Sequence, residues 1–215
     1  MPSRITMSQE PLPFDLAMNK EPQIASLPRV EFLLEESSME NVLRVILPQI
    51  LPQGYALGEN CFLRPHNGKH DLQKSIPRKI SAFSNPNNAA KIVILHDQDS
   101  SDCIALKQEL MRLCDSAGTA PRLIRVVCRE LESWYIGDPQ AIQAAYPRFH
   151  AQHYAKSSKF RTPDIQNASE ELKRLVPDFQ KGEASRIIPP FMMIDRNISP
   201  SFQAFVQGLQ RFLTE

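Results

Sequence analysis

The stretch KIVILHDQDSSD, residues 91–102, decides the fold of this chain. Its first half, KIVILH, is rich in β-branched and aliphatic residues and predicts a buried strand. Asp97 and Asp99 follow that strand directly, and Asp102 then opens an amphipathic helix expected over residues 102–117. A strand that leads through an acidic turn into a helix is the repeating unit of an α/β protein with a parallel sheet.

Three further strands are expected around this unit, each a short apolar run that ends at polar or charged residues. The runs are Val30–Leu34, Cys61–Arg64 and Leu123–Cys128. Helices are expected over 39–50, with Ser38 as N-cap, over 71–83, with Asp71 as N-cap, and from Asp138 onward. We predict an α/β fold with a Rossmann-like parallel sheet of about four strands, helices on both faces and a mainly helical C-terminal segment.

The prediction divides the chain into three parts. Residues 1–28 form an N-terminal arm, 29–150 the α/β core, and 151–215 a helical extension packed on that core. The arm is polar and proline-rich and has no apolar signal core. In the extension we expect a helix near 169–175, a loop that carries Lys181, and a final helix capped by Ser199.

Composition excludes several classes of protein. The 215 residues carry a net charge of +1, so no global basic excess indicates nucleic-acid binding. The four cysteines show no paired spacing, which argues against a zinc ribbon or a redox pair. No apolar run approaches the roughly 20 residues of a membrane span. We therefore expect a cytoplasmic protein that does not cross a membrane.

Carboxylates follow three of the four predicted strands. They are Glu35, with Glu40 one turn into the next helix, then Asp97 and Asp99, and finally Glu130 and Glu132. Parallel strands bring their carboxyl ends to one edge of the sheet, where grouped carboxylates repel one another unless a cation compensates them. Each motif alone also fits a helix start or a solvated face, but their joint placement predicts a site for Mg²⁺ or Mn²⁺.

Basic residues are expected to accompany these acids. The candidates for nucleic-acid contact are Arg64, Lys69, Lys156, Lys159 and Arg161, with a solvated loop as the alternative for the last three. Lys69 follows a glycine, which lets backbone and ammonium approach a phosphate. For His66 and His96 a hydrogen-bonding structural role is favoured over a ligand role, and for Tyr135 core packing is the default.

The glutamate after the first strand and the Asp-x-Asp after a later one resemble the Toprim fold of topoisomerases, primases and OLD-type nucleases. In that pattern glycine commonly follows the glutamate, whereas Glu36 stands there in this chain, so both Glu35 and Glu36 are candidates for the functional carboxylate. The spacing to Glu40 matches a second glutamate of OLD-like members and favours Glu35.

From Val30 onward the chain resembles, more narrowly, the Toprim-like domain-of-unknown-function family 4276. The resemblance is carried by LLEESSMENVLRVILPQILP, FLRPHNGKHDLQKSIP, VILHDQDSSDC, VCRELESWYIGDP, KGEASRI and SPSFQAFVQGL. It implies a metal-dependent phosphoryl-transfer fold that often stands beside an ATPase partner in phage defence or DNA maintenance, and a functional lysine near Lys181.

The expected function is that of a Mg²⁺-dependent nuclease or phosphodiesterase acting on nucleic acid, with an ABC- or AAA-type ATPase as partner. The expected catalytic residues are Glu35, Asp97, Asp99, Lys69 and Lys181. Two alternatives stay open. The chain is a non-catalytic regulatory or interaction subunit of an ATPase complex, or it is a phosphatase for small molecules. A homo-oligomer is compatible with each of these functions.

Overall fold

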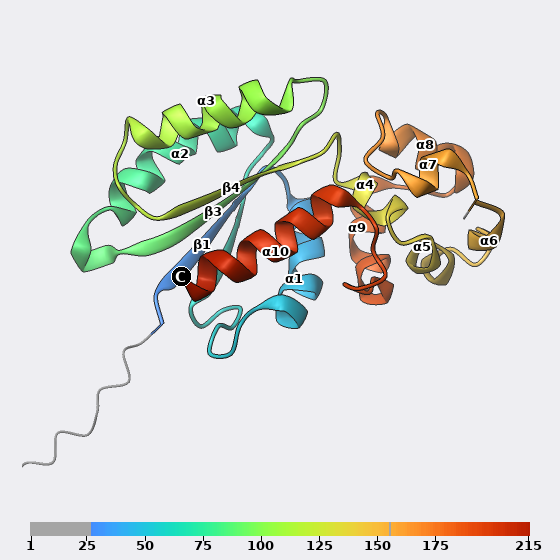
Figure 1. The fold of residues 1–215 in the computed structure, drawn as a ribbon, viewed down its shortest axis with the longest axis horizontal. Coiled ribbons are helices and arrows are strands. Elements are labelled where there is room, and N and C mark those ends of the chain that lie inside the picture. The colour runs from blue at the N-terminus through green and yellow to red at the C-terminus, as the bar shows by residue number, and fades with distance from the viewer. Residues whose placement is uncertain (1–26, 155) are drawn as a thin grey trace, which may run out of the picture.

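The computed structural model describes residues 27–154 and 156–215 and shows a parallel sheet with helices on both faces (Figure 1). The strands are β1 (Arg29–Leu34), β2 (Cys61–Pro65), β3 (Ala90–Asp97) and β4 (Arg122–Val127). The helices are α1 (Ser37–Ile50), α2 (Lys69–Phe83), α3 (Cys103–Asp115), α4 (Glu132–Ile136), α5 (Pro139–Ala145), α6 (Ala151–Tyr154), α7 (Ser158–Arg161), α8 (Ala168–Leu175), α9 (Lys181–Ile187) and α10 (Pro200–Thr214), with short 3₁₀ helices η1 (Pro86–Asn88) and η2 (Pro189–Phe191). The predicted arm, residues 1–28, lies outside the described residues except for its last two.

The sheet has the order β2-β1-β3-β4, and every neighbouring pair is parallel. In register, Leu34 of β1 lies beside Leu95 of β3, and Asp97 of β3 lies beside Val127 of β4. The carboxyl ends of the strands therefore meet at one edge of the sheet. This confirms the predicted fold class of a four-stranded parallel sheet and the predicted neighbourhood of the strand ends.

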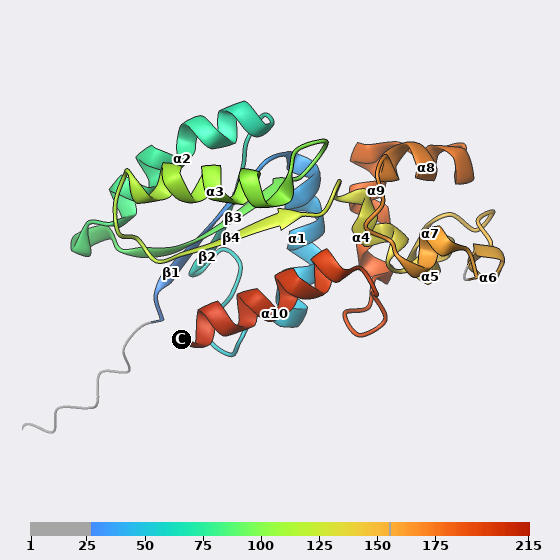
Figure 2. The same cartoon turned by 45° about the horizontal axis from the view of Figure 1, so that its top comes forward.

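The core forms two layers because side chains along β3 alternate between the faces of the sheet. Ile92 and Ile94 pack toward α2 and α3, whereas Val93 and Leu95 pack toward α1 and α10 (Figure 2). All four side chains are 0% exposed. A strand whose successive residues from Ile92 to Leu95 are all apolar thus requires a cover on both faces, as parallel sheets do.

The C-terminal helices return to the sheet. Helix α10 lies along β4, and α9 packs against α1 (Figure 1). Trp134 of α4 fixes this return, since its ring lies 5.2 Å from that of Phe202 and 5.4 Å from that of Phe205. The fold thereby brings residues after 180 close to the ends of the strands. Where the core ends and the extension begins stays a prediction.

Two predicted helix starts are wrong by two or three residues. Helix α1 begins at Ser37 with Glu36 in the N-cap position, not at Met39 behind Ser38, and α2 begins at Lys69 behind Gly68. Both turns are tied to the end of β1, because the backbone N–H of Gly68 donates to the carbonyl of Glu35 at 2.9 Å. The tertiary contact, rather than the best capping residue, sets where each helix begins.

Other local predictions hold. The side chains of Asp102, Asp138 and Ser199 each accept a hydrogen bond from the first turn of the helix that they precede. Lys181, expected in a loop, instead begins helix α9. Within the described residues, no helix is both long and apolar enough to cross a membrane.

Candidate functional site at the carboxyl edge of the sheet

Glu35 lies just beyond β1, and its carboxylate reaches across to the end of β3. Its Oε2 accepts a hydrogen bond from the backbone N–H of Asp97 at 2.9 Å and lies 3.0 Å from Nδ1 of His96. Burial acts to raise the pKa of Glu35, but the hydrogen bond and charge of His96 and the N–H of Asp97 outweigh it and lower the pKa. Glu35 is therefore held as a carboxylate that bridges two strand ends.

His96, near the end of β3, orients the carboxylate of Glu35. Its Nδ1 lies 2.6 Å from the carbonyl oxygen of Asp97, so this nitrogen carries the proton, and its Nε2 lies 3.3 Å from the amide nitrogen of Gln73. Burial acts to lower the pKa of His96, but Glu35 outweighs it and raises the pKa. The ring is 2% exposed, which makes it a buried support for Glu35.

Asp97 carries a buried carboxylate oxygen to which no group of the described chain donates a hydrogen bond. The residue is 6% exposed, and its Oδ1 atom is buried without any hydrogen-bond partner. Burial, together with the nearby charges of Glu132, Glu35 and Glu36, raises the pKa of Asp97 well above its ordinary value. An unpaired buried carboxylate among other carboxylates is costly, so the folded chain presents oxygen ligands that no protein group satisfies.

Glu132 approaches the same place from helix α4. The residue is 1% exposed, and Lys181 Nζ lies 3.5 Å from Glu132 Oε2, an ion pair too poorly aligned to count as a hydrogen bond. Burial raises the pKa of Glu132, although Lys181 opposes this. Tyr135 is one helical turn from Glu132 and therefore faces the same side; its hydroxyl is buried without a partner. Sequence reasoning missed this hydroxyl, although the spacing of three residues indicates a shared face.

Asp99 and Lys69 form the exposed rim of the site. Lys69 Nζ lies 3.8 Å from Asp99 Oδ2, and both side chains are nearly half exposed. Asp99 has a left-handed backbone, with φ of 51°, fixed by a hydrogen bond from its N–H to the carbonyl of Arg129 at 2.7 Å. Arg129 was not among the expected site residues.

Several expected site residues lie elsewhere or act differently. Glu130 Oε2 accepts a hydrogen bond from the backbone N–H of Ser169 at 2.8 Å and so caps α8. Glu40 forms an ion pair with Arg44 at 2.6 Å on the outer side of α1. Arg64 donates from Nε to the buried Glu31 at 2.8 Å, away from the strand ends.

The basic segment near α7 is not joined to the carboxylates by any contact that the structure describes. Lys156 and Arg161 are exposed, and the side chain of Lys159 lies outside the described residues. The structure thus brings together Glu35, Asp97, Glu132 and Lys181, with Asp99 and Lys69 at the rim. Glu36, the alternative candidate to Glu35, also lies close, since its charge acts on Asp97, Glu132 and Lys181.

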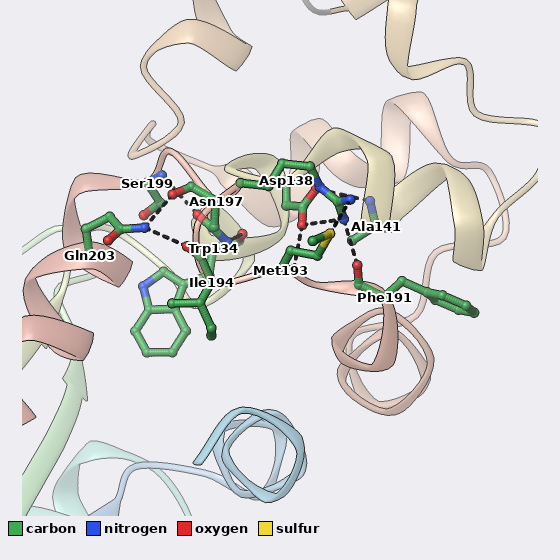
Figure 3. A network of polar contacts seen from close by, with 10 residues as sticks. Trp134, Asp138, Ala141, Phe191, Met193, Ile194, Asn197, Ser199 and Gln203 are labelled. Atoms are coloured by element: carbon green, nitrogen blue, oxygen red, sulfur yellow. Dashed lines mark hydrogen bonds and ion pairs between the residues drawn. The ribbon is translucent and has the colours of Figure 1, made fainter. Parts of the chain in front are cut away.

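A polar network around Trp134 and Asp138 holds the end of α4 in place (Figure 3). Asn197 donates from its amide to the carbonyl of Trp134 at 2.7 Å. Asp138, which is 0% exposed, accepts hydrogen bonds from Arg196 at 2.7 and 2.8 Å and from the backbone N–H of Met193 at 3.0 Å. This doubly bonded pair fixes the turn between α4 and α5, since a buried charge is stable only when it is paired.

The donor set suits a hard cation. Carboxylate oxygens are the ligands that Mg²⁺ and Mn²⁺ prefer, and Asp97 Oδ1 is a buried oxygen left free for one. Among residues 27–154 and 156–215, however, no three His, Cys, Asp or Glu side chains are grouped so that they could hold a metal ion as they stand. The residues fit a divalent cation in chemistry, and binding requires the carboxylates to turn toward one another.

Comparison with known proteins gives one match. A family model described as "Domain of unknown function (DUF4276)" matches residues 34–210. No curated protein and no solved structure matches the chain. The matched span includes Glu35, Asp97, Glu132 and Lys181.

Proposed function

The chain belongs to this family, and from its site we propose that it is a divalent-metal-dependent nuclease. The proposed reaction is hydrolysis of a phosphodiester bond in nucleic acid with Mg²⁺ or Mn²⁺. The Toprim-like relationship belongs to this proposal, with Glu35 as its glutamate and Asp97 and Asp99 as its Asp-x-Asp. So do a cytoplasmic location and an ATPase partner in phage defence or DNA maintenance.

One observation carries the proposal. Asp97 Oδ1 is buried and unpartnered at the edge of a parallel sheet, close to the charges of Glu35, Glu36 and Glu132. If Asp97 had only a structural role, this oxygen should have a hydrogen-bond or ion-pair partner. The buried carboxylate of Asp138, for example, is paired with Arg196. Ligands of open α/β sheets bind at this edge, and unsatisfied carboxylates there are typical of sites that await a cation.

The residues divide into ligands and supports. Glu35, Asp97 and Glu132 would hold the metal, with Asp99 or Glu36 completing the set. A bound metal at such a site compensates their charge and stabilises charge that develops on phosphate oxygens. His96 keeps Glu35 ionised and oriented, while Lys181 and Lys69 are cations placed to contact a substrate phosphate.

The test is hydrolysis of labelled single- and double-stranded DNA and RNA by the purified chain with Mg²⁺, Mn²⁺ or EDTA. Asp97→Asn and Glu35→Gln are expected to lower the rate by about 100-fold or more, the usual effect of losing a group that stabilises transition-state charge. Glu109→Gln removes an exposed carboxylate on α3 and serves as the matched control. Equal cleavage by wild type and Asp97→Asn would contradict the proposal.

A non-catalytic interaction subunit is the second candidate. It is favoured by the engagement of two expected ligands in other contacts, Glu130 with the start of α8 and Glu40 with Arg44. In that case Mg²⁺ and Mn²⁺ cause no cleavage, and Asp97→Asn binds its protein partner as the wild type does. Loss of partner-dependent function in Asp97→Asn at unchanged partner binding would exclude this candidate.

A further inference from the structure

A pocket of about 380 Å³ adjoins the carboxylate edge, between the turn after β3 and the turn after β4. It is lined by Asp99, Ser100, Arg129, Glu130, Gln166 and Asn167. Arg129 is the one cationic side chain of these six. Along the described chain its guanidinium is paired with no carboxylate, unlike those of Arg64 and Arg196.

The backbone holds Arg129 at this pocket. Asp99 and Arg129 both adopt left-handed conformations, with φ of 51° and 66°, which side chains other than glycine adopt at a cost. Two hydrogen bonds join the two turns, from Asp99 N–H to the Arg129 carbonyl at 2.7 Å and from Arg129 N–H to Gln98 Oε1 at 3.2 Å. Arg129 is therefore fixed beside Asp99 instead of continuing the line of β4.

The acids of the pocket are already engaged, which leaves Arg129 free for an anion. Lys69 lies 3.8 Å from Asp99, and Glu130 accepts a hydrogen bond from the start of α8. Ser100, Gln166 and Asn167 supply hydroxyl and amide groups, which suit sugar hydroxyls and base edges. A guanidinium surrounded by such groups is a phosphate ligand of the kind found in nucleic-acid sites.

We propose that this pocket binds the phosphate next to the scissile one, with Arg129 as its ligand. The substrate is then a polynucleotide, since a small ester with a single phosphate has no neighbouring phosphate to place there. This inference rests on the proposed function, because the scissile phosphate is assigned to the carboxylate edge, and it decides between the substrate classes that the site alone leaves open.

The kinetic test compares two substrates in the presence of Mn²⁺. One is a short thymidine oligonucleotide, and the other is bis(p-nitrophenyl) phosphate, a diester without a second phosphate. Arg129→Asn is the chosen variant, because asparagine tolerates the left-handed backbone while the positive charge is lost. We expect kcat/KM to fall by about tenfold or more for the oligonucleotide relative to its change for bis(p-nitrophenyl) phosphate. Arg112→Asn, an exposed arginine of α3, is the matched control.

A binding test separates the subsite from catalysis. Fluorescence anisotropy of the labelled oligonucleotide is measured without metal for the wild type, Arg129→Asn and Arg112→Asn. Arg129→Asn is expected to bind about tenfold more weakly, with a salt slope shallower by about 0.7, the value for one phosphate of a single strand. A melting curve for each variant checks that the fold is intact.

The outcomes distinguish the two claims. If wild type cleaves neither substrate but Arg129→Asn binds more weakly with the shallower slope, the proposed function fails and the phosphate subsite stands. If Arg129→Asn binds the oligonucleotide as the wild type does, the subsite is overturned whatever the activity. An equal fall in kcat/KM for both substrates overturns it as well, because Arg129 then acts on the scissile phosphate or on the fold.

Discussion

Replacement of Asp97 by asparagine is expected to stabilise the metal-free protein at pH 8 while removing the nuclease activity proposed above. Most substitutions of buried residues destabilise, so this direction is a sharp test. The side chain keeps its size, but a charge is lost among Glu35, Glu36 and Glu132.

The size of the effect follows from the isolation of Asp97. Its Oδ1 has no partner, and an unsatisfied buried polar atom costs about 1–3 kcal/mol. Relief of that cost raises the melting temperature of a chain of this length by about 2–12 °C, at roughly 2–4 °C for each kcal/mol.

The gain in stability of Asp97→Asn over wild type must depend on pH. The pKa of Asp97 is raised above its ordinary value of 3.8, so the folded state binds more protons than the unfolded state. The stability that this group contributes is full below pH 3.8 and is lost as the pH rises through the raised pKa. Asp97→Asn removes that loss, so the difference in stability from wild type is absent near pH 4 and grows as the pH rises through the raised pKa.

The assay is a thermal melt followed by circular dichroism in EDTA at several pH values, repeated with Mg²⁺. A ligand that binds only the folded state raises its stability, so Mg²⁺ should raise the melting temperature of wild type and not of Asp97→Asn. Glu130→Gln is the matched control and should lose stability, because Glu130 caps α8. Destabilisation of Asp97→Asn at pH 8, or a gain of equal size at pH 4, would refute the reasoning.

Three further substitutions test the surrounding contacts. Lys181→Met leaves the buried Glu132 unpaired and should lower the free energy of unfolding in urea by about 1–2 kcal/mol. The cost is less than for a fully buried pair, because Lys181 is nearly half exposed. An equal loss of stability in Lys181→Arg would contradict a charge effect. Arg196→Ala strips the ion pair from Asp138, which is 0% exposed, and should cost about 3 kcal/mol, whereas Arg148→Ala at an exposed site should cost less than about 0.5 kcal/mol. Glu40→Gln breaks the ion pair with Arg44, so it should lower the free energy of unfolding by less than about 0.5 kcal/mol. The rise in melting temperature expected with Mg²⁺ should stay as in wild type. Loss of that rise would indicate that Glu40 is a metal ligand.

The sheet was readable from the sequence because burial on both faces leaves an unmistakable pattern. In β3 every residue from Ile92 to Leu95 is apolar, and the acids begin where the strand leaves the core. The convergence of Asp97 with the end of β1 follows from parallel topology alone. Helix starts were less readable, since Gly68 and Glu36 gain their positions from contacts with the end of β1 and not from capping strength.

The roles of single acids depended on partners far along the chain. Glu130 and Glu132 look alike in sequence, yet one meets the start of α8 and the other meets Lys181 of α9. Periodicity cannot predict such pairs, because no local rule joins residue 130 to residue 169. Glu31 gave a signal that local reasoning can use: a charge inside an apolar strand requires a partner, and Arg64 supplies it.

The order of synthesis gives a further meaning to the return of α9 and α10. A ribosome releases the chain from its N-terminus, so Glu35 and Asp97 emerge long before Lys181 and before the aromatic rings that enclose Trp134. An activity that needs Lys181 is accordingly withheld from every unfinished chain. Translation that stops early leaves Glu132 without the ion pair from Lys181 and Trp134 without the rings of Phe202 and Phe205 that pack on it.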